Sequence, residues 1–137
     1  MQRSDQREPE PVQSTPEVDE FLRDKIDTVP HLEALLLVWT ARPKPYSVKE
    51  MADRLFLAPE AAKEILDDLV RSGLIAAVPG AGECYCYDPE PERDRLMAAV
   101  DTTYRQELIR VSRLIHSKPS AAIREFARAF RLKKERD

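Results

Sequence analysis

Hydrophobic positions recur with helical spacing in two stretches before residue 45. A short first helix is predicted from the apolar residues Phe21, Leu22, Ile26 and Val29. After Pro30 a second helix with one buried face is predicted, because apolar residues recur at i, i+3, i+4 and i+7: Leu32, Leu35, Leu36 and Trp39. Pro43 and Pro45 end it, since proline cannot continue a helix. We expect Trp39 to belong to the core.

Two short helices joined by a tight turn are predicted over residues 47–73. Ser47 and Glu50 form an S-x-x-E capping box, so the first of these helices starts at about Val48. Its inward face is Met51, Ala52 and Leu55. Pro59 suits the first turn of the second helix, and Gly73 follows its end. The inward face of the second helix is Ile65, Leu66, Leu69 and Val70.

A β-hairpin is predicted next, with strands over residues 74–78 and 83–88 around the turn "PGAG". Cys84 and Cys86 share one face of the second strand, and Tyr85 and Tyr87 share the other. We expect the cysteines to pack as small apolar residues. A metal or redox site is the alternative, although the two histidines, His31 and His116, lie far away in the sequence. For the tyrosines we expect hairpin packing, with a ligand or partner surface as the alternative.

A long helix of about 24 residues is predicted from residue 92, extending ~36 Å. Its apolar stripe follows a repeat close to 3.5 residues, which is typical of a seam between two chains. We therefore expect a homodimer through this stripe, which consists of Met97, Val100, Tyr104, Leu108, Val111 and Ile115. After Pro119 a last helix is predicted, with Ile123, Phe126, Ala127 and Phe130 on one side and Arg124, Arg128 and Arg131 on the other.

Residues 31–88 resemble the winged helix-turn-helix domain of bacterial transcriptional regulators of the multiple-antibiotic-resistance type. The matching features are the small residue inside the first motif helix, the leucines that flank the turn, the proline after it, the apolar pair and the closing "LVRSGLI": Ala52, Leu55, Leu57, Pro59, Ile65 and Leu66. The resemblance implies a second motif helix that lies in the major groove of DNA and a wing that reaches the minor groove.

The groove-facing positions depart from that family's pattern. Where the family usually carries serine, threonine and arginine, this sequence has Ala58, Glu60, Ala61, Lys63 and Glu64, and Asp68 stands at a position that is commonly basic. The wing tip is Gly80, Ala81, Gly82 and Glu83, without a basic residue. Carboxylates in a DNA groove are repelled by phosphates and lose hydration. The nearby candidates for phosphate contacts are Lys44, Lys49, Arg54 and Arg71.

Charge is distributed unevenly along the chain. The net charge is −3, yet residues 102–137 hold 10 basic and 4 acidic side chains. Contacts with phosphates or an acidic partner are therefore expected from this third of the chain, chiefly from Arg124, Arg128, Arg131, Lys133 and Lys134. This basic stripe is interpreted as a solvated face that balances an acidic partner subunit, as a DNA contact, or as a membrane-surface contact.

These patterns predict a fold that is mainly α with a small β-hairpin: a winged helix-turn-helix domain plus a long C-terminal helix. The expected organisation is a disordered tail over 1–18, the winged domain over 19–91, and a helical dimerisation and basic region over 92–137. No catalytic constellation, phosphate loop, cofactor site or metal site is recognised, and no signal peptide or membrane span, so we expect a non-enzymatic cytoplasmic protein. The leading hypothesis is a dimeric transcription regulator that binds DNA weakly or mainly through phosphates. The alternative is a protein-interaction module that has lost DNA reading.

Overall fold

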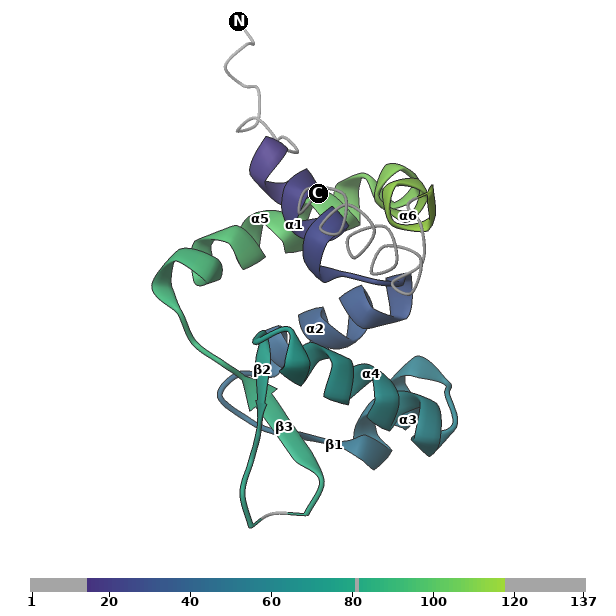
Figure 1. The fold of residues 1–137 in the computed structure, drawn as a ribbon, viewed down its shortest axis with the longest axis vertical. Helices are drawn as coiled ribbons and strands as arrows, with labels where there is room; N and C mark the ends of the chain where they lie inside the picture. Colours follow the sequence, from purple (N-terminus) through teal and green to yellow (C-terminus); the bar gives the residue numbers. More distant parts are fainter. Residues whose placement is uncertain (1–14, 81, 118–137) are drawn as a thin grey trace, which may run out of the picture.

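The structure is a computed structural model that describes residues 15–80 and 82–117 (Figure 1). Its elements in chain order are α1 (Pro16–Lys25), α2 (Val29–Ala41), β1 (Tyr46–Ser47), α3 (Val48–Leu55), α4 (Pro59–Arg71), β2 (Ile75–Ala77), β3 (Cys84–Tyr87), α5 (Pro91–Gln106) and α6 (Leu108–Ser117). The predicted fold class, mainly helical with a small sheet, is confirmed. Among the described residues, no helix is both long and apolar enough to cross a bilayer.

Side-chain caps begin most of these helices. Thr15 accepts a hydrogen bond from the Val18 amide at the start of α1, and Thr28 does the same for the His31 amide in α2. The predicted capping box at Ser47 and Glu50 is present at the start of α3. Each cap satisfies an amide that the helix itself leaves without a partner. Local sequence chemistry thus determines where these helices begin.

The sheet has three strands rather than the two of the predicted hairpin, in the order β1-β3-β2 and antiparallel. In the β2–β3 register Ala76 pairs with Cys86, so alternate residues of β3 face opposite sides of the sheet. Tyr85 and Tyr87 are buried, which confirms that they pack within the domain. The cysteines lie on the other face and are only half-buried, so the expected burial of these two side chains is not observed.

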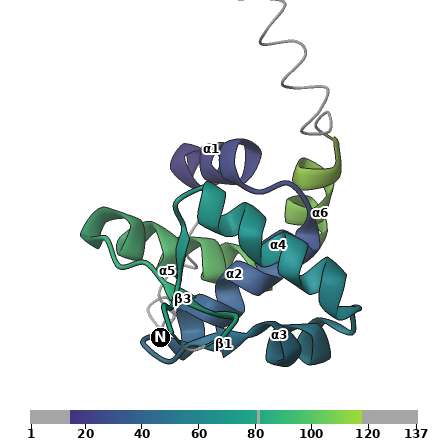
Figure 2. The ribbon, with the colours of Figure 1, turned by 60° about the horizontal axis from the view of Figure 1, so that its bottom comes forward.

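One hydrophobic core extends through all the helices and the sheet. α2 lies in the middle, with α1, α5 and α6 on one side and α3 and α4 on the other (Figures 1 and 2). Leu32 and Leu35 of α2 are fully buried, as are Leu66 of α4 and Met97 of α5. The C-terminal helices therefore complete the core of the winged domain and do not form a separate unit up to residue 117.

The predicted long helix is wrong, because the chain breaks between α5 and α6 at Glu107, whose φ of −128° and ψ of 48° are not helical. Arg110 holds the break, with its guanidinium 2.6 Å from the carboxylate of Glu107 and 3.3 Å from that of Asp19 in α1. α6 then folds back against α1 and α5. An unbroken helix of about 24 residues would have extended beyond the domain. Because of the break, α6 packs onto the domain instead.

The break changes the expected dimer seam. Four residues of the stripe are buried in the chain's own core: Met97, Val100, Val111 and Ile115. Their apolar spacing therefore reflects intrachain packing, and the expectation that all six positions form a seam is corrected. Leu108 remains 50% exposed and Tyr104 is half-buried. The predicted helix after Pro119 and its basic residues lie outside the described residues.

The predicted boundary of the N-terminal tail is also corrected. α1 begins at Pro16, and Val18 has no exposed surface. Burial of this hydrophobic side chain in a capped helix stabilises the start of α1. Residues 1–14, where the rest of the predicted tail falls, lie outside the described residues.

Candidate nucleic-acid interface

The turn between α3 and α4 sets the angle of the two motif helices. Phe56 ends α3 in the left-handed region, with φ 58° and ψ 47°, and its amide donates to the Ala52 carbonyl. The next amide, that of Leu57, donates to the same carbonyl at 2.9 Å. A left-handed residue ends a helix by turning the chain away, and here glycine's usual role is taken by a phenylalanine. The ring of Phe56 is 92% exposed.

The exposed face of α4 carries the predicted acidic residues. Pro59 occupies the first turn, and Ala58 at the cap position makes no side-chain hydrogen bond. Glu60 and Glu64 are exposed one turn apart, as expected from the sequence. Glu60 lies in the first turn, where the helix dipole favours a carboxylate. This surface therefore presents negative charge to any macromolecule that approaches the helix.

Lys63, the one lysine of α4, is bound to the wing side of the helix. Its ammonium lies 2.9 Å from the carboxylate of Asp67 and 3.9 Å from that of Glu83. The hydrogen bond to Asp67 raises the pKa of Lys63. The same bond lowers the pKa of Asp67, which also accepts from the Tyr85 hydroxyl at 2.8 Å. Lys63 thus belongs to a group of polar contacts that connects α4 to β3, and its charge is largely balanced by carboxylates.

Asp68 is partly buried and bound to neighbouring side chains, which the sequence alone did not indicate. Its side chain is 25% exposed and lies 2.8 Å from Nε2 of His31 in α2. Its other carboxylate oxygen accepts from Arg71. The helical rotation between positions 64 and 68 is about 40° past one turn, which is enough to direct Asp68 toward α2 while Glu64 stays exposed. Asp68 therefore belongs to a contact between α4 and α2, whereas the Arg71 side chain is 70% exposed.

Several further cations near the motif lie on α3 and in the loop before it. Lys49 is 3.5 Å from Asp53, and both side chains are largely exposed. Arg54 donates to the Tyr46 hydroxyl at 3.0 Å. Lys44 is exposed in the α2–β1 loop, and Arg42 lies 4.3 Å from the centre of the Trp39 ring. Lys44, Lys49 and Arg54 thus remain on the surface near the motif, as predicted.

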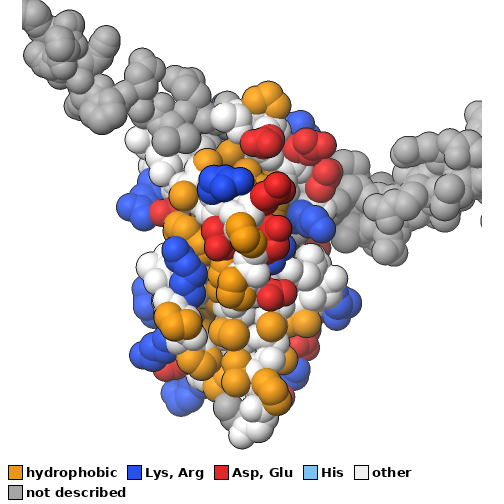
Figure 3. Space-filling view, turned by 90° about the vertical axis from the view of Figure 1, so that its left-hand side faces the viewer, with side chains coloured by type: hydrophobic (Ala, Val, Ile, Leu, Met, Phe, Trp, Pro, Cys, Tyr) orange, Lys and Arg blue, Asp and Glu red, His pale blue; other side chains and the backbone are white. Residues whose placement is uncertain are grey.

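The wing turn is built on two glycines with positive φ, 76° at Gly80 and 73° at Gly82. Glu83 follows on the exposed side, and Ala81 lies outside the described residues. The outward face of the wing is apolar and half-buried, formed by Ala76, Val78, Cys84 and Cys86. Figure 3 shows this side of the molecule, where hydrophobic side chains run over the lower part and acidic side chains gather in the upper part. The described part of the wing presents no cation.

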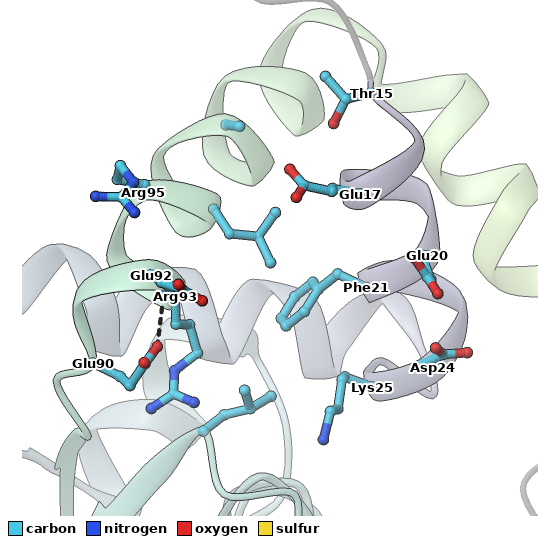
Figure 4. A pocket seen from close by; sticks show the side chains of 13 residues that line it. Thr15, Glu17, Glu20, Phe21, Asp24, Lys25, Glu90, Glu92, Arg93 and Arg95 are labelled. Carbon is cyan, nitrogen blue, oxygen red and sulfur yellow. Dashed lines mark hydrogen bonds between the residues drawn. The ribbon is translucent and has the colours of Figure 1, made fainter.

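An open hollow of about 650 Å³ lies between α1 and the start of α5 (Figure 4). Phe21 points into it, beside Leu74 and Leu96. Its rim mixes both signs of charge: Glu17, Glu20, Asp24, Lys25, Glu90, Glu92, Arg93 and Arg95. Glu90 caps α5 by accepting from the Arg93 amide at 2.7 Å. The lining residues include no histidine, cysteine or serine.

Sequence reasoning missed three long-range contacts, two of which hold α4 in place. The His31–Asp68 pair spans 37 residues, the Tyr85–Asp67 pair 18, and the Tyr104–Glu33 pair 71. In each pair the two residues belong to different elements, so no pattern within one helix or strand could reveal the contact. Only the residue types, a histidine, tyrosines and acids at the edges of apolar faces, hinted that such bonds were available.

Comparisons with known proteins support the fold. The chain resembles the crystal structure of a MarR family transcriptional regulator from Streptomyces coelicolor, with a TM-score of 0.52 and 22% sequence identity. The match covers 86% of this chain and 80% of that one. No family model matches the sequence, and no curated protein matches it either. The chain therefore has a winged-helix fold of the MarR type.

Proposed function

We propose that this chain is a non-enzymatic, bacterial-type transcription regulator that acts as a homodimer and binds duplex DNA mainly through phosphate contacts. The observation that carries the proposal is the intact helix-turn-helix and wing, in a fold shared over most of the chain with a transcriptional regulator. A winged-helix fold hosts other functions as well, so the charges at the surface determine how DNA would be bound.

Those charges favour phosphate contacts over base reading. Bidentate recognition of guanine needs an arginine or lysine in the groove, and Lys63 is held by Asp67. Surface cations near the motif are on α3 and the preceding loop, where they can reach the backbone of a duplex. The basic residues 124–134 add to this, although they lie outside the described residues. The resulting binding is mostly electrostatic and depends on salt.

The test is binding of the full chain to random duplex DNA across a salt series. We expect log affinity to fall linearly with log salt, losing about one unit of slope for each phosphate contact removed. Lys49→Ala with Arg54→Ala should lower the slope by about two. Arg124→Ala, Arg128→Ala and Arg131→Ala together should nearly abolish binding.

A second test of DNA binding uses substitutions on the acidic face of α4. Glu60→Gln with Glu64→Gln should tighten DNA binding, because repulsion from phosphates is removed. The matched control is Glu17→Gln with Glu20→Gln on α1, which changes the net charge equally at a distant surface. Tightening by the control alone, or an affinity no better than ~10⁻⁴ M at physiological salt, would refute DNA binding as the function.

A protein-interaction module is the second candidate, favoured by the exposed Glu60 and Glu64 beside a neutralised Lys63. Such a surface is suited to a basic partner. Under this hypothesis the Glu60→Gln and Glu64→Gln variant loses partner capture and gains no DNA affinity. The same pair of substitutions therefore moves binding in opposite directions for the two functions.

A further inference from the structure

Three side chains from two distant segments converge beside the buried start of α2. One ligand-type atom from each of Asp27, His31 and Asp68 lies within 4.8 Å of the other two. We propose that these three residues bind a divalent first-row transition-metal cation, with Zn²⁺ as the ion that suits them best. Imidazole nitrogen and carboxylate oxygen together favour such ions over Mg²⁺ or Ca²⁺, which take oxygen ligands.

The imidazole of His31 is fixed in the way that metal-ligating histidines are fixed. Its Nδ1 lies 2.6 Å from the hydroxyl oxygen of Thr28, which is itself held as the cap of α2. His31 is 92% buried, and its other nitrogen, Nε2, faces Asp68 at 2.8 Å. A hydrogen bond on one ring nitrogen orients the other toward a metal. The contact with Thr28 therefore fixes the direction in which Nε2 points.

The two carboxylates complete the set from opposite sides. Asp27 precedes the cap residue of α2 and is half-buried, and Asp68 comes from α4. Arg71 binds the oxygen of Asp68 that does not face His31, so the second oxygen, Oδ2, is left on the side of the imidazole. Carboxylate ligands of metals are commonly held by such outer hydrogen bonds. The site thus has three candidate protein ligands.

The distances require only small movements. Zinc binds nitrogen and oxygen at about 2.0–2.2 Å, which puts two ligands of one tetrahedral ion about 3.4 Å apart. The His31–Asp68 pair at 2.8 Å must open by roughly half an ångström, and the other pairs, which lie within 4.8 Å, must close where they exceed about 3.4 Å. Metal ligands bind in their deprotonated forms, so binding weakens as the pH falls.

Binding would connect the α1–α2 segment to α4 independently of any DNA contact. α4 would then be held by a metal as well as by the core, and the chain should be more stable when loaded, because a ligand that binds only the folded state stabilises it. The proposal does not rest on the proposed function, since metal binding is measured on the protein alone.

The experiment is calorimetric titration of the full metal-free chain with Zn²⁺, repeated with Co²⁺ while its visible spectrum is recorded. We expect one ion per chain, a rise in melting temperature, and a Co²⁺ spectrum without a thiolate band. Asp27→Asn and His31→Gln should each weaken binding by roughly tenfold or more. The thermal unfolding of each variant is first measured without metal to show that it folds. If His31→Gln does not fold, Asp27→Asn alone tests the proposal.

Three matched controls keep the result specific. His116→Gln removes the second histidine, Asp53→Asn removes an exposed carboxylate, and Cys84→Ser with Cys86→Ser removes the thiols that most readily bind zinc. All three should bind like the wild type. The proposal is overturned by no saturable Zn²⁺ or Co²⁺ binding, by unchanged affinity in Asp27→Asn, or by loss of binding in the cysteine variant.

Discussion

Single side chains at the edge of the core hold α4 in position. Adjacent residues of α4 point to different neighbours, with Asp67 bound to Tyr85 of the sheet and Asp68 bound to His31 of α2. Polar contacts of this kind determine orientation, because leaving one partner buried without the other costs more than the bond contributes. The position of α4 therefore depends on two neighbouring carboxylates.

The contact of Asp67 with Lys63 should contribute measurably to the free energy of unfolding. We expect Asp67→Asn to destabilise the chain by about 1 kcal/mol near neutral pH, because it loses the charged partner of Lys63 while the Tyr85 bond is largely kept. The pKa of Asp67 is lowered below the usual 3.8 by Lys63, so its contribution is present above 3.8 and is lost as the pH falls through the folded-state pKa. Urea denaturation at several pH values measures this. A gap between variant and wild type that widens in acid would contradict it.

Tyr104 should affect the stability of the fold at alkaline pH. Burial, and then its hydrogen bond to Glu33 at 2.9 Å, raises the pKa of Tyr104 from 10.0 to about 12. The folded chain therefore favours the neutral phenol, and this stabilisation is complete below pH 10.0 and lost as the pH rises to about 12. We expect Tyr104→Phe to lose stability less steeply over this range. The same slope in variant and wild type would show that other groups control alkaline unfolding.

Among the elements, α1 gives the clearest prediction. Deleting residues 1–18 removes the Thr15 cap and the buried Val18, so we expect a loss of roughly 2–4 kcal/mol in the free energy of unfolding. Deleting residues 1–14 is the control, and from the polar composition of that segment we expect little change. Chemical denaturation of the two truncations measures both. Equal stability of the two would mean that α1 adds little to the core.

Helix ends and apolar faces could be predicted from the sequence because their causes are local. The capping box at Ser47, the proline at residue 59 and the spacing of the leucines in α2 act within one or two turns. The two-residue β1 has no periodicity to detect, and its pairing with β3 depends on residues nearly forty positions away. The break at Glu107 was missed because apolar spacing is the same for one long helix and for two helices that pack on one core.

The candidate site was predicted only where exposure follows from helical phase. Glu60 and Glu64 are exposed as expected, whereas Asp68 is turned inward by His31, a partner 37 residues away. Carboxylates on a predicted helix are expected to be solvated unless a buried partner is known. The sequence contains His31 but gives no indication that α2 and α4 cross at this point.

For the whole molecule, the dimer remains a prediction and has a different candidate contact. Leu108 and Ile109 are adjacent at the start of α6 and are 50% and 65% exposed. Leu108→Glu with Ile109→Glu should therefore give a folded monomer, because neither side chain is needed in the core of one chain. Val111→Glu is the contrasting variant, and it should unfold the chain because Val111 is fully buried.

Sedimentation and circular dichroism together test this assignment. Wild-type chains that sediment as monomers at tens of micromolar would exclude the homodimer. A dimer that survives the double substitution at 108 and 109 would place the interface elsewhere.

The two inward contacts of α4 have a consequence for engineering. Because the sheet and α2 hold the helix from behind, positions 60, 61 and 64 contribute little to its placement. Surface substitutions away from buried partners usually change stability by less than about 0.5 kcal/mol. The outer face of α4 can thus be rewritten with arginine, asparagine or glutamine on an unchanged backbone. We therefore expect a library of variants at positions 60, 61 and 64 to stay folded, so that it can be screened for new binding properties.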